Sequence, residues 1–414
     1  MRIHFVGISG VSMNALAAAV ASRGHAVTGS DANISGHDAN AVDGADLVVY
    51  TNAVPQDNCE LMRARELGIP IIERASYLGE LSKTYENVTA VAGCHGKSTT
   101  TAMLGAVYRP RRATVHVGVA GGSVTGCDKY FITEACEYRA SFLHLNPDMG
   151  VILNIQYDHP DFYKTTDALY DAYRKFGNKC KKLVVNGDDA KCRELFGGAV
   201  TFGLNENCDY FARDVKSDGG CRSFTLDGKR HASVKLAIAG QHNVYNALAT
   251  IAAASENGLT LTEILPKLQS FRGIARRFEL VGLAHGKTVF TDYAHHPDEI
   301  AATIKTAREI YPSVAVVFQP HTYTRTRSLF DEFAAALSQA DTVILAPIFS
   351  AREKPIQGVT SHALCRKILP LNEKAYCFDT FTEILDCAKS LREKAIIFMG
   401  AGDINTAARI FATI

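Results

Sequence analysis

The stretch Ala92-Gly93-Cys94-His95-Gly96-Lys97-Ser98-Thr99-Thr100-Thr101 decides the fold. The apolar run Val88–Val91 before it predicts a buried strand, and Ala102–Val107 after it predicts the body of a helix. A strand, a glycine-rich turn and Gly-Lys-Ser at a helix start form a phosphate-binding loop, because glycines let the backbone approach phosphates and helix-start amides point at them. The lysine adds a point charge, and a serine hydroxyl can ligate Mg²⁺. The stretch therefore predicts nucleotide binding on an α/β sheet.

This loop is shorter than the common form. The common motif has a glycine five residues before the glycine of its Gly-Lys pair, and Val91 stands at that position here. The turn reads Gly-x-x-Gly-Lys-Ser, with a histidine inside it. The residues that we expect to contact a nucleotide are Gly93, Cys94, His95, Gly96, Lys97, Ser98 and Thr99. The alternative is a decayed loop in a protein that no longer hydrolyses anything.

Composition limits the class of protein. The chain has 414 residues, which suggests two to four domains of about 100–200 residues. Lys and Arg number 44 against 43 Asp and Glu, so net charge gives no support for a nucleic-acid or membrane-surface partner. The eleven cysteines are scattered, the N-terminus begins with strand-like Arg2–Val6, and no apolar run is long enough to span a bilayer. We therefore expect a cytoplasmic protein without a signal peptide.

Strand and helix patterns divide the chain into three α/β blocks. The expected domains are residues 1–83, Rossmann-like; residues 84–272, a P-loop-type ATPase domain with a parallel sheet; and residues 273–414, again Rossmann-like. Within the second block, residues 199–238 change to short alternating segments, which predict an antiparallel appendage.

The turn after the first strand reads Gly7-x-Ser9-Gly10-x-Ser12-Met13. It does not match the dinucleotide fingerprint, since serines occupy two glycine positions, but a strand-to-helix turn can still bind a diphosphate through its amides. Asp31, at the end of the second strand, could bind a ribose hydroxyl. A Rossmann-like turn without a ligand is the alternative.

Polar residues follow several strands of the second block. Glu134 in Glu-Ala-Cys-Glu and His159 in Tyr-Asp-His-Pro stand at strand ends, where such sheets bind ligands. A carboxylate there suits Mg²⁺. Taken alone, however, Glu134 fits a solvated acidic turn better, and His159 fits a capped loop equally well. His242, Asn243 and Asn246 begin a helix; the two amides share a face that could bind a purine edge or simply cap the helix.

The third block carries basic and histidine-rich strand ends. Arg277, at its entrance, could pair with phosphate or form a surface ion pair. Asp292-Tyr293-Ala294-His295-His296-Pro297 could indicate a metal hydrolase. The run Phe318–Arg327 brings His321 and Arg325 to the crevice, where they suit a carboxylate.

Together these motifs resemble those of the Mur ligases, in order and spacing, over essentially the whole chain. The matching segments are Gly93–Thr101, Glu134–Phe142, Asn154–Tyr163, Gly240–Ala247, Arg276–Glu279, Asp292–Ile300 and Phe318–Arg327. The resemblance implies an ATP-dependent amide ligase with UDP-sugar, ATP and amino-acid domains. Glu134–Phe142 and Gln319–Arg325 look like members that add L-alanine to UDP-N-acetylmuramate. Asp292–Pro297 is shared with the ligase that recycles murein tripeptide.

The resemblance also implies roles for individual residues. Lys97, His159 and Arg325 would be catalytic, and Ser98, Glu134 and His159 would hold Mg²⁺. ATP would contact the loop together with His242, Asn243, Asn246, Arg277 and Asp292. The substrates, UDP-N-acetylmuramate and L-alanine, would contact Ser9, Gly10, Ser12, Met13, Asp31, Tyr293, His295, His321 and Arg325.

The chain departs from the family at several positions. Ser9 and Ser12 replace glycines, Cys94 and Ser98 replace threonines, and Thr322 stands where many members have arginine. The stretch from residue 31 to 37 is short, so the UDP-sugar domain looks trimmed. These changes leave open a nucleotide-binding protein that has lost ligation, and the sequence leaves open whether the chain is a monomer or a weak dimer.

Overall fold

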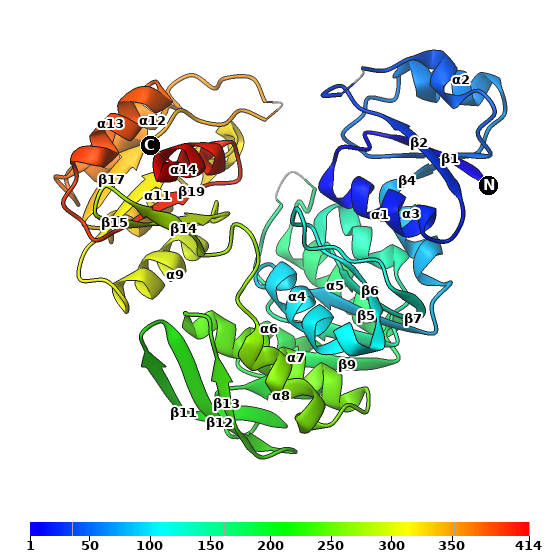
Figure 1. The fold of residues 1–414 in the computed structure, drawn as a ribbon, viewed down its shortest axis with the longest axis horizontal. Helices are drawn as coiled ribbons and strands as arrows, with labels where there is room; N and C mark the ends of the chain where they lie inside the picture. The colour runs from blue at the N-terminus through cyan, green and yellow to red at the C-terminus, as the bar shows by residue number, and fades with distance from the viewer. Residues whose placement is uncertain (35, 160–161, 352, 414) are drawn as a thin grey trace. The chain divides into compact units, whose positions relative to one another are not determined.

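The computed structural model describes residues 1–34, 36–159, 162–351 and 353–413. The chain forms two compact units, described separately below (Figure 1). Unit 1 comprises Met1–Val215, Ser223–Lys235 and Asn243–Phe271. Unit 2 comprises Lys216–Arg222, Leu236–His242 and Arg272–Ile414. The boundaries expected at residues 83 and 272 stay predictions.

The first sheet of unit 1 has four parallel strands in the order β2-β1-β3-β4. They are β1 (Arg2–Val6), β2 (Ala26–Ser30), β3 (Leu47–Tyr50) and β4 (Ile71–Glu73). The helices associated with them are α1 (Val11–Ala21), α2 (Cys59–Glu66) and α3 (Arg74–Ser82). The turn from β1 to α1 needs glycine at position 7, where φ is +90° and a Cβ would lie 2.6 Å from Thr51 Cγ2. The predicted Rossmann-like block is confirmed.

The second sheet of unit 1 has nine strands in the order β13-β12-β11-β10-β9-β8-β5-β7-β6. Strand β5 (Asn87–Ala92), which leads into the phosphate loop, lies between β8 (Met149–Ile152) and β7 (Cys127–Glu134) and is parallel to both. The outer strands are β6 (Ala113–His116), β9 (Lys182–Asn186), β10 (Val200–Gly203), β11 (Tyr210–Asp218), β12 (Cys221–Gly228) and β13 (Ala232–Leu236). The helices are α4 (Lys97–Tyr108), α5 (Thr166–Lys179), α6 (Ala190–Leu195), α7 (Gln241–Glu256) and α8 (Leu261–Ser270).

The expected antiparallel appendage is partly wrong. Strand β10 pairs parallel with β9 on one side and with β11 on the other. The parallel sheet therefore continues into residues 199–238. Alternation of side chains cannot reveal this, because it gives the period of a strand and not the direction of its neighbour.

Unit 2 contains a six-stranded sheet in the order β14-β15-β19-β16-β17-β18. Only the β14–β15 pair is antiparallel. The strands are β14 (Glu279–Ala284), β15 (Lys287–Asp292), β16 (Val314–Phe318), β17 (Thr342–Leu345), β18 (Ala375–Cys377) and β19 (Ala395–Met399). The helices are α9 (Pro297–Arg308), α10 (Tyr323–Ser328), α11 (Phe330–Leu337), α12 (Ser361–Ile368), α13 (Phe381–Ser390) and α14 (Ile404–Thr413).

Two separate hydrophobic clusters draw on alternate residues of the same strands in unit 2. Val316 belongs to one cluster, whereas its neighbours Ala315 and Val317 belong to the other. The sheet is therefore buried on both faces, as a parallel sheet with helices on each side requires. Three α/β sheets confirm the predicted fold class. Among the described helices, none has both the length and the apolar character needed to cross a membrane.

Candidate functional site

The phosphate loop joins β5 to α4 as predicted, and its glycines have backbone angles that other residues avoid. Gly93 has a φ of +138° and Gly96 a φ of +86°. A Cβ at Gly96 would lie 2.6 Å from Asn246 Oδ1 and 3.0 Å from Leu153 Cδ1. Only glycine fits there, because the φ angle is positive and because a side chain has no room. The loop therefore packs closely against Leu153 and against Asn246 of α7.

Lys97, the first residue of α4, is held by a buried carboxylate. Its Nζ lies 3.0 Å from each carboxylate oxygen of Glu137, and it also donates to the carbonyl oxygens of Gly93 (2.5 Å) and Cys94 (3.3 Å). Burial opposes both charges, but each ion stabilises the other, so the pKa of Lys97 is raised and that of Glu137 is lowered. Both groups are charged at neutral pH.

His159 joins the same carboxylate. Its Nε2 lies 3.5 Å from Glu137 Oε1, and its ring packs against Tyr138 with centroids 4.7 Å apart. The hydroxyl of Tyr163 donates to the Glu137 carbonyl oxygen at 2.6 Å. The predicted catalytic residues Lys97 and His159 thus meet at Glu137.

Sequence reasoning missed Glu137, although the same acidic turn carries it three residues after Glu134. Glu134 ends β7 and accepts a hydrogen bond from the Gly118 amide at 2.6 Å. The Ser98 side chain is buried in the first turn of α4. The roles of Glu134 and Ser98 as metal ligands stay predictions, while Glu137 is the carboxylate that contacts both Lys97 and His159.

The start of α7 packs against the loop. Asn246 donates to Asn243 Oδ1 at 3.0 Å and accepts from Thr100 Oγ1 at 3.2 Å, and both asparagines are buried. His242 is exposed at the helix start. The two amides share a face, as expected, and they link α7 to α4. Contact with adenine stays a prediction for all three residues.

A cavity of about 260 Å³ lies beside α1 within unit 1. It extends from Ser9 and Asn14 on the helix side to His116, Leu81 and Phe131. The helix itself begins after Gly10, which has no capping side chain, and its first turn has no acidic residue, so its amide end favours an anion. Cavity and helix start together can hold an anionic ligand with an apolar part.

The predicted substrate residues of the first block lie at this helix start. The Ser9 amide donates to Asp31 Oδ2 at 3.2 Å, and Ser12 Oγ lies 3.0 Å from His116 Nε2 and 3.3 Å from Arg74 Nη1. Burial, with the nearby Arg74 charge, lowers the pKa of His116 to about 4, so this ring is neutral. The Met13 side chain is packed in the core, so a substrate contact there would be through its backbone.

Unit 2 brings four predicted residues into one region: Tyr293, His295, His321 and Arg325. His295 Nδ1 lies 2.9 Å from the Tyr293 carbonyl oxygen, and the His295 and His321 rings lie 6.1 Å apart. The His321 ring also stacks on Phe349, with centroids 5.7 Å apart. Burial first, and then His295 and Arg325, lower the pKa of His321 to about 4. A neutral ring pair next to an arginine suits a carboxylate ligand.

Asp292 and Arg277 have structural contacts in unit 2. The Asp292 carboxylate accepts hydrogen bonds from the amides of Phe278 (2.7 Å) and Ala294 (2.8 Å), and burial raises its pKa to about 6. Arg277 lies 3.7 Å from Glu299 and over the Tyr293 ring. Contact of either residue with ATP stays a prediction.

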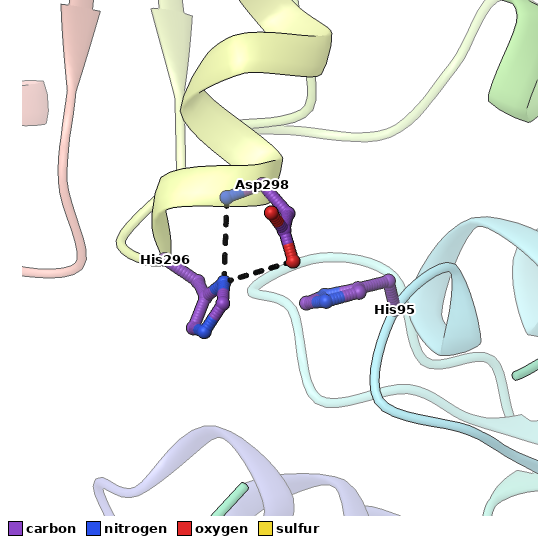
Figure 2. Close-up of side chains that lie close together, drawn as sticks. All are labelled: His95, His296 and Asp298. Atoms are coloured by element: carbon purple, nitrogen blue, oxygen red, sulfur yellow. Dashed lines mark hydrogen bonds and ion pairs between the residues drawn. The ribbon is translucent and has the colours of Figure 1, made fainter. Parts of the chain in front are cut away.

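The three residues of the metal-hydrolase alternative, Asp292, His295 and His296, make separate contacts in this region. His296 caps α9: its Nδ1 accepts from the Asp298 amide at 3.3 Å and lies 3.6 Å from the Asp298 carboxylate (Figure 2). In the described ranges of the chain, Asp292, His295 and His296 do not bring their ligand atoms together as a metal-binding group. The three residues are instead engaged with the backbone around the β15–α9 turn.

The pKa of His321 predicts a pH dependence of stability. Because the folded pKa lies below the ordinary value of 6.5, the unfolded chain binds a proton between pH 6.5 and about 4 that the folded chain does not. The stability due to neutral His321 is therefore present above pH 6.5 and is lost as the pH falls toward 4. We expect the free energy of unfolding, measured in urea, to fall more between pH 7.5 and pH 5 for the wild type than for His321→Gln.

The matched control for this experiment is His231→Gln, because the His231 side chain is 68% exposed. This variant should lose as much stability as the wild type over the same pH interval. Equal losses in the wild type and His321→Gln would contradict the assignment.

Comparisons with known proteins agree over the whole chain. Three family models match: Mur ligase family, catalytic domain, at residues 2–86; Mur ligase middle domain at 91–254; and Mur ligase, glutamate ligase domain, at 276–402. The UDP-N-acetylmuramate–L-alanine ligase of Acetivibrio thermocellus is 40% identical, covering 99% of this chain and 95% of the relative. The ligase of the same name from Lachnospira eligens is 39% identical, covering 98% and 96%.

A solved structure gives the same result. The crystal structure of UDP-N-acetylmuramate–alanine ligase MurC from Thermotoga maritima matches with a TM-score of 0.86 and 30% identity, covering 100% of this chain and 98% of that one. A murein peptide ligase from Psychrobacter arcticus shares the fold with a TM-score of 0.70 at 24% identity. The phosphate loop, the three sheets and these matches agree. The chain therefore belongs to the Mur ligase family.

Proposed function

We propose that this protein is an ATP-dependent ligase that joins L-alanine to the carboxylate of UDP-N-acetylmuramate through an acyl phosphate. The observation that carries the proposal is the cluster of Lys97, Glu137 and His159 at the phosphate loop. The relatives that share about 40% of its sequence over nearly their full length are named for this reaction.

The cluster fits a nucleotide with a divalent cation. Glu137 is ionised, buried and next to the loop, and carboxylate oxygens are the ligands that Mg²⁺ prefers. We infer that Glu137, Ser98 and His159 hold Mg²⁺, with Glu134 as a further candidate. Mg²⁺, when bound, would offset charge on the phosphoryl oxygens.

For the cation to bind at Glu137, the Lys97 ammonium has to exchange its contact with Glu137 for a contact with phosphate. In the structure its ammonium is engaged by Glu137 and by two loop carbonyl oxygens. A phosphate in the loop would compete for the same ammonium, and this would free the Glu137 carboxylate for the cation. The loop therefore exchanges an internal ion pair for contacts with the nucleotide.

The proposed chemistry needs no protein nucleophile. The muramyl carboxylate attacks the γ-phosphorus, ADP leaves, and Lys97 stabilises the charge on the transferring group. The alanine amine then attacks the acyl carbon, and phosphate leaves. The loop thiol takes no part, because burial raises the pKa of Cys94 to about 12 and keeps it protonated.

Two further regions are proposed to hold the other substrates. The helix start and cavity at α1 would take the diphosphate and sugar, with Ser9, Gly10, Ser12 and Asp31 nearby. In unit 2, Tyr293, His295, His321 and Arg325 would bind the amino acid, with Arg325 on a carboxylate.

Phosphate release tests the proposal. With ATP and Mg²⁺, the protein should release phosphate only when UDP-N-acetylmuramate and an amino acid are both present, and the product mass should rise by one alanyl residue. Competition among L-alanine, glycine and L-serine should favour L-alanine. Preference for a tripeptide would indicate the recycling ligase, and absence of turnover with every combination would indicate a protein that has lost ligation.

The position of the carboxylate that holds the cation is tested by a pair of variants. Glu137→Gln should lower kcat by about 100-fold or more and raise the Mg²⁺ concentration for half-maximal rate, because Glu137 contacts both Lys97 and His159. Glu134→Gln, three residues away, should have the smaller effect. The reverse order would place the cation at Glu134.

The amino-acid region is tested on α10. Arg325→Ala should raise the KM for L-alanine or UDP-N-acetylmuramate by about tenfold or more, while the KM for ATP changes little, since Arg325 acts on His295 and His321. Arg327→Ala is the control, because Arg327 lies on the same short helix and is exposed. An effect of Arg325→Ala confined to ATP would contradict the placement.

A further inference from the structure

One side chain holds the phosphate loop through both the nitrogen and the oxygen of its amide group. Asn154 follows β8, and its Nδ2 donates to the His95 carbonyl oxygen at 3.0 Å, while its Oδ1 accepts from the His95 amide at 2.9 Å. His95 is the middle of the loop, between the two glycines. One asparagine side chain thus bonds both the backbone N–H and the backbone C=O of His95, as the backbone of a neighbouring strand would.

The loop has little intrinsic preference for its conformation. Gly93 and Gly96 flank the region with φ angles of +138° and +86°, and glycine is the residue with the most conformational freedom to lose. Without external bonds, the amides that must converge on a phosphate would sample many directions. The two bonds from Asn154 restrict the residue between these glycines directly.

Neighbouring contacts show that the segment after β8 forms a surface for the loop. A Cβ on Gly93 would lie 3.0 Å from Leu153 Cβ and 3.2 Å from the Asn154 amide nitrogen. The Cys94 thiol donates to the Gln156 carbonyl oxygen at 2.9 Å. Within this surface, Asn154 is the side chain that bonds the loop backbone at both a donor and an acceptor.

We infer that Asn154 is a positioning residue that pre-orders the phosphate loop for the nucleotide. The inference rests on one part of the proposed function, namely that a nucleotide binds in the loop. Its two bonds to His95 are made within the protein itself, so the cost of ordering the loop is met on folding and not on binding. Loss of these bonds should therefore weaken nucleotide binding more than it weakens the fold.

Asn154→Ala tests this, with Asn186→Ala as its matched control. Asn186 is the last residue of β9 and donates from the same kind of amide to the Leu153 carbonyl oxygen at 3.0 Å, one residue away from Asn154, but it does not bond the loop. Asn154→Ala should raise the dissociation constant of ADP with Mg²⁺, and the KM for ATP, by about tenfold or more. The KM values for UDP-N-acetylmuramate and L-alanine should stay the same.

Calorimetric titration with ADP and Mg²⁺ separates this inference from the proposed reaction, because it needs no ligation. Urea unfolding of both variants measures the loss of stability. Asn154→Gln, which keeps the amide but shifts it by one methylene, should also bind ADP more weakly. It replaces Asn154→Ala in the titration if the alanine variant does not fold. Equal ADP affinities for the Asn154 variants and Asn186→Ala, at equal loss of stability, would overturn the inference.

Discussion

The site depends on the buried ion pair between Lys97 and Glu137. Moving two charges out of water costs several kcal/mol for each ion, and a buried pair is therefore poor evidence for stability alone. Here the pair lies at the start of α4, in the predicted phosphate loop, and His159 contacts the same carboxylate. In the proposed function this pair has two tasks: Lys97 supplies a cation for the phosphate, and Glu137 supplies an ionised carboxylate for the metal.

The rest of unit 1 supports this pair. One hydrophobic cluster includes Phe5 of β1 and Leu16 of α1 together with Phe142 and Tyr173 of the second block. The polar contact from Ser12 to His116 crosses between the same two blocks. The start of α1 and the phosphate loop are therefore parts of one compact body, so the predicted sites for the UDP-sugar and for the γ-phosphate belong to the same unit. The predicted amino-acid residues belong to the other.

Sequence patterns could predict the loop because its chemistry is local. Strand, glycines and Gly-Lys-Ser follow one another directly, and buried strands are marked by apolar runs. Which of Glu134 and Glu137 contacts Lys97 and His159 is not decided by the local sequence. It depends on the turn after β7, where Arg139 and Ala140 both adopt φ of +53°, an uncommon conformation for residues other than glycine. The contact of Gly96 with Asn246 likewise joins residues far apart in the chain. The parallel pairing of β10 was missed for the same reason, since strand direction is set by tertiary contacts.

In the proposed reaction, the loop delivers the γ-phosphate to a substrate carboxylate and not to water. UDP-N-acetylmuramate labelled with ¹⁸O in its carboxylate tests this most directly, with ATP, Mg²⁺ and L-alanine present. Each phosphate released should carry one ¹⁸O from the carboxylate, as an acyl phosphate requires. Unlabelled phosphate, with both ¹⁸O atoms retained in unreacted UDP-N-acetylmuramate, would contradict it.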